Sequence, residues 1–215
     1  MADIFREVDE DLRRDRATQL WKTYGAYVIG AAVAIVLGTL AHQLWQSWDL
    51  DRRTELSEQY VAATELAADD RESAILALAE IGGPDGGYGT LATFERAQIL
   101  ADDGRHDEAL AIWDQLAADS SGGPAFQAVA MLFSVMHQID DGDPAALEAK
   151  LQPLTTADNR FRPLAMELGA ILALRQGQID QARQIYTQIA DDLAAPAGLR
   201  TRAAQMVAAL KEGPS

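Results

Sequence analysis

A long segment without charged side chains, close to the N-terminus, limits this chain more than any other feature. Residues 23–48 contain no Asp, Glu, Lys or Arg and are rich in Val, Ile, Leu, Ala and Gly. A helix from Trp21 to Trp45 would be about 36 Å long, enough to cross the ~30 Å hydrocarbon core of a bilayer. Both ends of the segment have the aromatic side chains typical of membrane interfaces, namely Trp21, Tyr24, Tyr27, Trp45 and Trp48. The sequence therefore predicts a single N-terminal transmembrane helix over residues 23–48.

The basic residues around this segment predict its orientation. Four of the five basic residues before it lie between Arg13 and Lys22, whereas the first basic residues after it are Arg52 and Arg53. Because Lys and Arg concentrate on the cytoplasmic side of a span, the N-terminus is expected in the cytoplasm. In a Gram-negative cell, the chain would then be a single-pass protein of the cell inner membrane with residues 49–211 in the periplasm.

Two other interpretations of the segment fit less of the sequence. A cleaved signal peptide could use residues 39–41 (Thr-Leu-Ala) as its cleavage site. However, the segment is longer than the ~7–15 residue apolar core of such peptides, and the lead of 22 residues contains acidic groups. A buried helix of a soluble protein would also be apolar on all sides, yet it has no need of aromatic residues at both ends. An uncleaved anchor is therefore favoured.

Small residues recur every fourth position inside the predicted span, at Gly30, Ala34 and Gly38. Such a stripe lets the backbone of a second helix approach closely in lipid, where van der Waals packing drives helix association. We take these three residues as a candidate helix-packing face. The partner helix could belong to another copy of the chain or to a different protein.

Residues 1–22 form the predicted cytoplasmic tail. Ile4, Val8 and Leu12 follow the spacing of one face of a helix, which indicates an amphipathic helix that runs into the membrane. The tail could contact a cytosolic or membrane partner, or it could be a solvated helix with no partner of its own.

The composition excludes several classes of protein. Hydrophobic residues make up 48% of the chain and charged residues 24%, which is ordinary for a folded protein and argues against general disorder. The formal net charge of −15 repels phosphate backbones, so nucleic acid is not expected as a partner. The chain has no Cys, which excludes disulfides, thiolate catalysis and cysteine-ligated metals.

Beyond the span, helical patterns alternate with turns at nearly constant spacing. The turns at Asp69, Gly104, Gly142 and Gly177 lie 35, 38 and 35 residues apart. Apolar residues recur 5, 9 and 12 positions after each turn: Ala74, Leu78 and Ile81; Ala109, Trp113 and Leu116; Leu147, Leu151 and Leu154; Ala182, Tyr186 and Ile189. A helix–turn–helix unit of about 34 residues, with a small residue early in the second helix, has the form of a tetratricopeptide repeat.

This register predicts an all-α fold, with three to four helical hairpins stacked into a tetratricopeptide-like α-solenoid over residues 49–211. One hairpin cannot bury its apolar face alone, so hairpins must stack. Glycine in the turn supplies a left-handed helix stop, and Trp113, Leu151 and Tyr186 are expected in the core. Pro196 to Leu210 is expected to be the terminal capping helix and residues 212–215 a frayed tail. An irregular helical bundle is the alternative.

A protein-binding surface is expected on the first helix of each hairpin, because first helices line the inner wall of such solenoids. The polar residues chosen there as candidates are Glu95, Gln98, Gln127 and Gln138.

No arrangement of catalytic or metal-binding residues is visible in the sequence. His42, His106 and His137 have no metal-ligand spacing, and the zincin, hydrolase-elbow and P-loop motifs do not occur. The acidic run at residues 140–143 lacks the spacing of a calcium loop and is better explained as a turn and helix cap. We therefore expect no catalytic residue, no cofactor and no metal, and a protein that is not an enzyme.

The order of these features resembles a known family. Asp9-Glu-Asp-Leu-Arg13 before Trp21, then one span and an acidic repeat domain, is similar to the ancillary SecYEG translocon subunits, the YfgM-like proteins, and most of all to their alphaproteobacterial branch. The resemblance implies a bitopic inner-membrane protein whose periplasmic repeats associate with the SecYEG translocon and a membrane-anchored periplasmic chaperone. There it would bind polypeptide clients and assist the folding of exported proteins. A scaffold for envelope assembly or cell division with the same fold is the alternative.

Overall fold

The computed structural model describes residues 2–83 and 87–212. The side chains of residues 2–21, of a few further residues up to position 32, and of residue 212 lie outside this description. So do residues 213–215 of the predicted C-terminal tail and the side chains of Ile4, Val8 and Leu12. Every regular element in the described residues is a helix, which confirms the predicted all-α class.

The helices follow one another along the chain with short connections: α1 (Ala2–Leu66), α2 (Arg71–Ile81), α3 (Gly87–Asp102), α4 (His106–Ala118), α5 (Pro124–His137), α6 (Pro144–Leu151), η1 (Gln152–Leu154), α7 (Arg162–Arg175), α8 (Ile179–Asp191) and α9 (Ala197–Glu212). Two compact units divide the chain, residues 1–55 and residues 56–215. Helix α1 contributes to both units.

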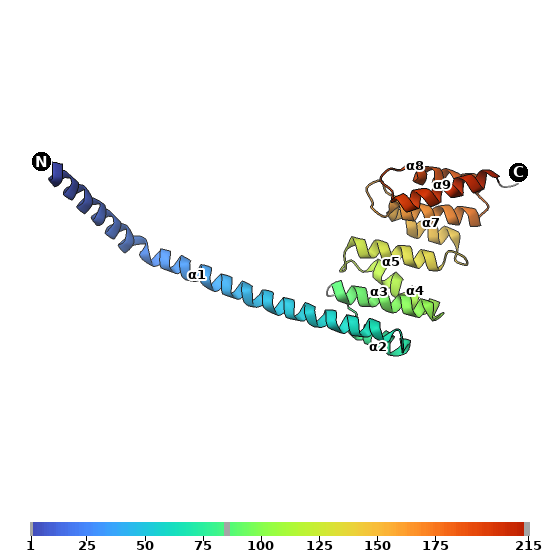
Figure 1. Ribbon diagram of the computed structural model, residues 1–215, viewed down its shortest axis with the longest axis horizontal. Helices are drawn as coiled ribbons and strands as arrows, with labels where there is room; N and C mark the ends of the chain where they lie inside the picture. The colour runs from blue at the N-terminus through green and yellow to red at the C-terminus, as the bar shows by residue number, and fades with distance from the viewer. Residues whose placement is uncertain (1, 84–86, 213–215) are drawn as a thin grey trace. The chain divides into compact units, whose positions relative to one another are not determined.

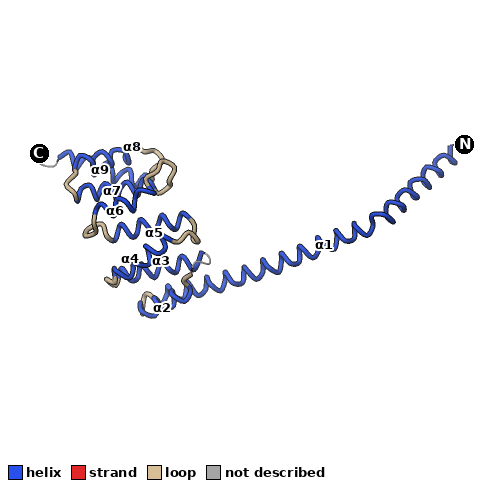
Figure 2. Tube along the Cα trace, turned by 180° about the vertical axis from the view of Figure 1, so that it is seen from behind, coloured by secondary structure: helices blue, strands red, loops and turns tan. Residues whose placement is uncertain are grey.

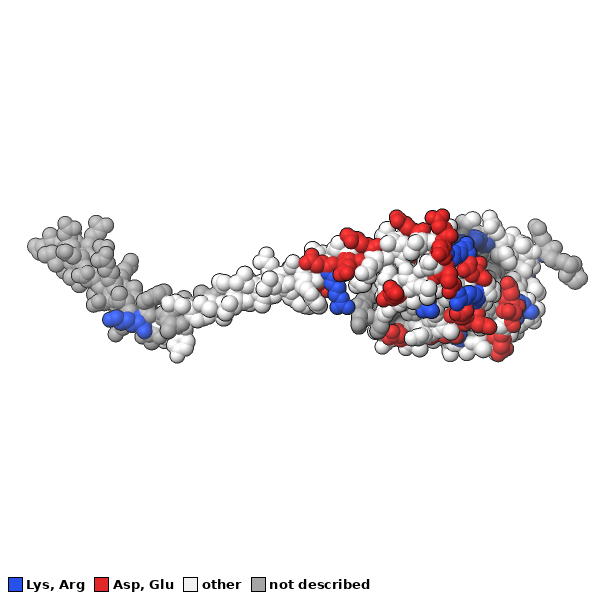
Figure 3. Space-filling model, turned by 90° about the horizontal axis from the view of Figure 1, so that it is seen from below, with Lys and Arg blue, Asp and Glu red and all other residues white. Residues whose placement is uncertain are grey.

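The first unit is the part of α1 that contains the predicted span. Among the described residues, one helix is long and apolar enough to cross a membrane, and it is this one. Large apolar side chains are exposed along it, for example Tyr27 at 77% and Leu44 at 72%, and Figure 3 shows a stretch of it without coloured, charged atoms. The Thr39 hydroxyl donates to the carbonyl oxygens of Ile35 and Val36 at 3.0 and 2.9 Å, so its polar atom is satisfied within the helix. Such a surface is suited to lipid.

Charged and aromatic side chains meet where the apolar segment ends. The guanidinium of Arg52 lies over the ring of Trp48, 6.0 Å from its centroid, and Arg53 pairs with Asp49 at 2.8 Å. An indole beside a cationic group suits the headgroup layer of a membrane.

The second unit is a stack of hairpins in chain order (Figures 1 and 2). Its first hairpin is the end of α1 with α2, and the next three are α3 with α4, α5 with α6, and α7 with α8, followed by α9. The first hairpin joins α2 to the end of α1, because Ala63 is buried in the same apolar cluster as Ile75 and Leu78. The described residues thus form four hairpins, in agreement with the predicted solenoid. Three local clusters of buried residues replace a single central core, as expected when each hairpin contacts only its neighbours.

The predicted register of the second helices is confirmed. All twelve apolar residues placed 5, 9 and 12 positions after a turn are buried, except Ile81 and Leu116, which are half-buried. Trp113 is 1% exposed and stacks on Phe133 and His137, with ring centroids 5.6 and 4.4 Å away.

The turns differ in how they use glycine. Gly104 and Gly177 have φ of 78° and 73°, the left-handed conformation that was predicted. The prediction of a left-handed conformation is wrong for Gly142, whose φ is not positive. A Cβ atom there would lie 2.8 Å from the carbonyl oxygen of Gln138, so a close backbone approach is what requires glycine. Asp143 then caps α6 by accepting a hydrogen bond from the Ala146 N–H at 3.3 Å.

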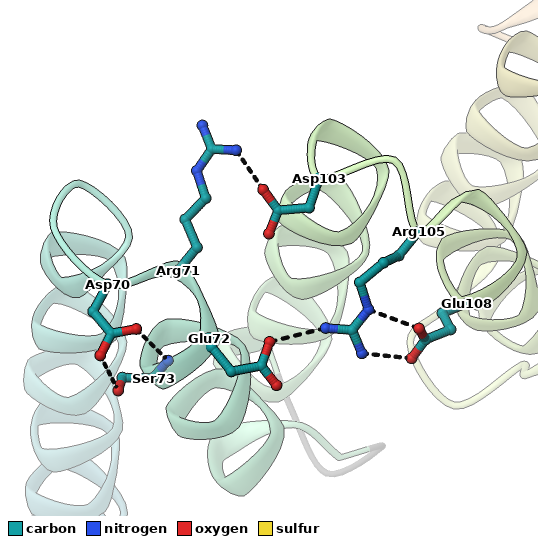
Figure 4. A network of polar contacts seen from close by, with 7 residues as sticks. All are labelled: Asp70, Arg71, Glu72, Ser73, Asp103, Arg105 and Glu108. Carbon is teal, nitrogen blue, oxygen red and sulfur yellow. Dashed lines mark hydrogen bonds and ion pairs between the residues drawn. The ribbon is translucent and has the colours of Figure 1, made fainter.

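Polar side chains join the turns of the first two hairpins (Figure 4). Arg105 donates two hydrogen bonds of 2.7 Å to the carboxylate of Glu108 and a third of 2.9 Å to Glu72 on α2. Arg71 pairs with Asp103 beside them. Because these groups are largely exposed, each pair adds little stability, and their main effect is to fix one turn against the next.

Candidate protein-binding surface

The first helices present equivalent residues when they are aligned on the turn that follows. The positions 13, 10, 9 and 6 residues before the turn glycine form what we call the first-helix face. Its members are Leu91, Phe94, Glu95 and Gln98 on α3; Val129, Leu132, Phe133 and Met136 on α5; and Leu164, Glu167, Leu168 and Ile171 on α7. The rings of Phe94 and Phe133 lie 6.1 Å apart, so the face passes from α3 to α5.

A groove of about 350 Å³ lies on this face between α5 and α7. Its walls are Val129, Leu132, Phe133 and Met136 from α5, Phe161, Leu164, Glu167 and Leu168 from the segment of α7, and Arg202 from α9. Met136 is 45% exposed and Leu164 39%. Large apolar side chains that line a concavity and remain open to solvent are typical of a site for another molecule.

Local sequence explains why these two helices line one groove. Gly123, with φ of 89°, and Pro124 begin α5, and the side chain of Asn159 accepts the N–H of Phe161 at 2.8 Å just before α7. The helix between them is short, because α6 ends at Leu151 and Pro153 lies in the single 3₁₀ turn that follows. Helices α5 and α7 therefore touch each other directly.

One ion pair stands at the edge of this otherwise apolar groove. Arg202 donates from Nε and Nη2 to the two carboxylate oxygens of Glu167, at 3.1 and 2.9 Å. These bonds raise the pKa of Arg202 above its usual value. Burial raises the pKa of the nearby Tyr186 phenol, and the negative charge of Glu167 adds to the effect. The groove thus offers a large apolar area and one fixed polar point.

The four polar residues chosen from the sequence do not all share this face. Glu95 and Gln98 lie on it, and the Gln98 amide donates to Asp102 at 2.9 Å. Gln127 instead donates to the carbonyl oxygen of Ala117 on α4 at 3.2 Å. Gln138 donates to the carbonyl and hydroxyl oxygens of Ser134 on its own helix, at 2.9 and 3.1 Å. Their role in binding stays a prediction.

The candidate helix-packing residues of the span are open to their surroundings. Gly30, Ala34 and Gly38 are exposed, and a Cβ atom added at either glycine would meet nothing within 4 Å. Their contact with a second helix also stays a prediction.

Sequence reasoning missed the apolar members of the groove. The run from Ala128 to Met136 is apolar except for Ser134, and no binding role was predicted for it, although Met136 is exposed. A comparison of the three first helices by register would have shown the difference. The face has a carboxylate and an amide at Glu95 and Gln98 on α3, but only apolar residues at the same positions on α5.

Groups suited to catalysis are sparse in the described part of the chain. No cluster of three or more His, Asp or Glu residues there could hold a metal ion. The half-buried His137 stacks on Trp113, and burial lowers its pKa below the ordinary value of 6.5.

Comparison with known proteins agrees with this architecture. A family model described as a tetratricopeptide repeat-like domain matches residues 18–208. No curated protein and no solved structure matches the chain. Domains of this kind are typically non-catalytic scaffolds for protein–protein interaction. Because the match extends from just before the apolar segment to the last helix, the chain belongs to the tetratricopeptide repeat-like domain family.

Proposed function

We propose that this protein is a membrane-anchored adaptor that binds polypeptide segments in the groove between α5 and α7. The observation that supports this most directly is the open apolar lining of the groove, with Met136 and Leu164 exposed. Its size suits one or two apolar side chains of a partner, and burial of such side chains is the main source of affinity in protein recognition.

The anchor determines where this binding takes place. The basic residues before the span support a cytoplasmic N-terminus and a periplasmic repeat domain in the cell inner membrane. Tethering confines the domain to the membrane surface, which raises its effective concentration toward other membrane proteins. Weak contacts with such partners are then sufficient.

The partners that we propose are the SecYEG translocon and a membrane-anchored periplasmic chaperone, with exported polypeptides as clients. The support for these partners is the resemblance of residues 3–41 and of the overall order of segments to the translocon subunit family. The alternative is a scaffold for envelope assembly or cell division. The two functions would use the same groove and differ only in the proteins bound there.

Crosslinking from the groove tests the proposal. A photoreactive amino acid is placed at Leu164, in the groove, and in a matched protein at Leu76, which is 61% exposed on α2 and outside it. After irradiation of living cells, translocon or chaperone subunits, or exported polypeptides, should be joined at position 164 and not at position 76. Adducts with envelope-assembly or division proteins would favour the alternative. Identical adducts at both positions, or none at either, would refute binding in the groove.

A charge in the groove provides a second test. Leu164→Glu should reduce co-purification of these partners from detergent-solubilised membranes, because a carboxylate would have to be buried on binding. Leu76→Glu makes the same change outside the groove and should leave co-purification intact. Equal loss in both variants would contradict the assignment.

A further inference from the structure

The three junctions between successive hairpins can be compared position by position. At each junction, one residue lies eight positions before the turn glycine, on the first helix: Arg96, Ser134 and Gly169. Each set has two further residues, one ten positions after the preceding turn and one eight positions after the following turn. They are Ala79 and Ile112 with Arg96, Asp114 and Lys150 with Ser134, and Gln152 and Ile185 with Gly169. These three junction sets are equivalent in the repeat, but they differ in chemistry.

At the middle junction the three side chains form a closed polar network. The Ser134 hydroxyl, which is fully buried, donates to the carboxylate of Asp114 at 2.6 Å. The Lys150 ammonium donates to the same carboxylate oxygen at 2.7 Å and to the Ser134 oxygen at 2.9 Å. At this junction the Asp114 carboxylate is therefore the acceptor for both the buried hydroxyl and the ammonium group.

At the first junction the cation is present and the carboxylate is missing. Arg96 lies at the position of Ser134, while Ala79 replaces Asp114 and Ile112 replaces Lys150. The Nε atom of Arg96 is buried and has no hydrogen-bond partner, and no ion pair joins this guanidinium to any residue of the described ranges. Leaving a buried N–H of a charged group without an acceptor is costly, and a guanidinium is built to bind planar carboxylates.

Arg96 lines a cavity of about 210 Å³, much larger than the ~30 Å³ share of one water molecule. Its lining includes the apolar side chains of Leu78, Ile112, Leu116 and Phe126 and, besides Arg96, the polar side chains of Thr90, Thr93, Gln115 and Asp119. Two of its lining residues, Ala79 and Gln115, are exposed to solvent.

The acidic groups close to Arg96 have other partners. The Glu108 carboxylate accepts two hydrogen bonds of 2.7 Å from Arg105 (Figure 4); these bonds lower the pKa of Glu108, and the charge of Arg96 contributes less. Asp119 lines the cavity, but its carboxylate accepts the N–H and the hydroxyl of Ser121, both at 2.8 Å. Neither of these carboxylates accepts a hydrogen bond from Arg96, so a bound molecule with a carboxylate could supply the acceptor that the described residues lack.

We propose that this cavity binds the carboxylate group of a ligand through Arg96, with a short apolar part of the ligand against Leu78, Ile112 and Phe126. The inference goes beyond the adaptor function, because the cavity shares no lining residue with the groove between α5 and α7. The third junction has a cavity of about 380 Å³, but Gly169 stands where Arg96 stands in the first, so carboxylate recognition through this position is specific to the first junction.

Sodium butyrate is the probe, and butyramide and sodium chloride at equal concentration are its neutral and ionic controls. In the full chain in detergent micelles, butyrate should raise the Tm saturably and shift the NMR resonance of the Arg96 Nε–H, which Arg96→Met identifies by its loss. Butyramide and chloride should do neither. If all three solutes act alike, or if the Arg96 resonance does not move, the cavity holds water only and the proposal fails.

Arg96→Met could fail to fold, so two further variants test the site without changing Arg96. Ala79→Asp restores the carboxylate seen at the middle junction, so it should raise the Tm without ligand and weaken the butyrate response at least about tenfold. Ala204→Asp adds the same group at an exposed position of α9 and should leave the response unchanged. An undiminished response in Ala79→Asp would overturn the assignment of the site.

A pair of short apolar peptides, identical except for a free or an amidated C-terminus, identifies the source of the carboxylate. If the free acid shifts the Arg96 resonance and the amide does not, the carboxylate belongs to a polypeptide end. If butyrate alone acts, the ligand is a small organic acid. Both results support carboxylate binding, whereas equal shifts by acid and amide would contradict it.

Discussion

Replacing Trp113 with alanine is expected to lower the free energy of unfolding of the hairpin stack by about 3–5 kcal/mol. Trp113 is 1% exposed and stacks on the rings of Phe133 and His137. A buried indole removes about 150–250 Å² from water, which at ~25 cal/mol per Å² corresponds to about 4–6 kcal/mol. Alanine keeps a small part of that burial, and the cavity left behind adds to the loss.

Urea unfolding of the full chain in detergent micelles, followed by circular dichroism at 222 nm, measures this difference. The span stays helical in the micelle and contributes a constant signal, so the transition reports on the hairpin stack. Leu193→Ala serves as the control, because Leu193 is 87% exposed and should change the free energy by no more than about 0.5 kcal/mol.

A loss below about 1 kcal/mol in Trp113→Ala would refute the reasoning, because it lies outside the range for a large side chain removed from a packed core. The register counted from Gly104 would then be wrong, and with it the burial of the equivalent Tyr186.

Three further predictions follow from single positions. Burial lowers the pKa of His137 below 6.5 in the folded protein, and the charge of His106 adds to the effect. The folded state therefore favours neutral His137. The resulting stability is fully present above the pKa of the unfolded chain and is lost as the pH falls through the lower pKa of the folded protein. Urea midpoints between pH 7.5 and 5 should show this loss in the wild type and a smaller one in His137→Gln. Gly104→Ala should lower the free energy of unfolding by about 1–2 kcal/mol because the φ of Gly104 is 78°. Gly169 lies in a helix with open space for a Cβ atom, so Gly169→Ala should raise the free energy of unfolding by about 0.5–1 kcal/mol. A denaturant titration that ranks the two variants the other way would contradict the turn geometry. Ser134→Ala removes the hydroxyl from the middle junction and should cost about 1 kcal/mol in the same titration, and an unchanged midpoint would show that the network is not stabilising.

The core of the hairpins could be predicted from the sequence because it depends on local spacing alone. Residues 5, 9 and 12 positions after a turn fall on one side of a helix whose start the turn defines. Ala109 and Trp113 are therefore buried for a reason that can be read from one hairpin. The same rule found the weaker copy that begins at Asp69.

The groove could not be predicted in this way, because it depends on how neighbouring hairpins meet. Pro153 shortens the helix after α5, and this brings α5 and α7 into contact. Whether Met136 is then buried or exposed depends on that contact, not on its own helix. The Nε atom of Arg96, which has no hydrogen-bond partner among the described residues, is a similar case, since the missing acceptor becomes visible only when Ala79 is compared with Asp114 one hairpin later.

The unequal junctions have a consequence for how the stack opens. In a repeat array, stability is a sum of hairpin terms and of contacts between neighbours. The middle contact is tied by Ser134 and its two charged partners, while the contacts on either side enclose cavities. Amide hydrogens of α5 should therefore exchange with solvent more slowly than those of α2 or α9. A partner seated against α5 would rest on the part that stays folded longest and could remain bound while the outer helices open and close.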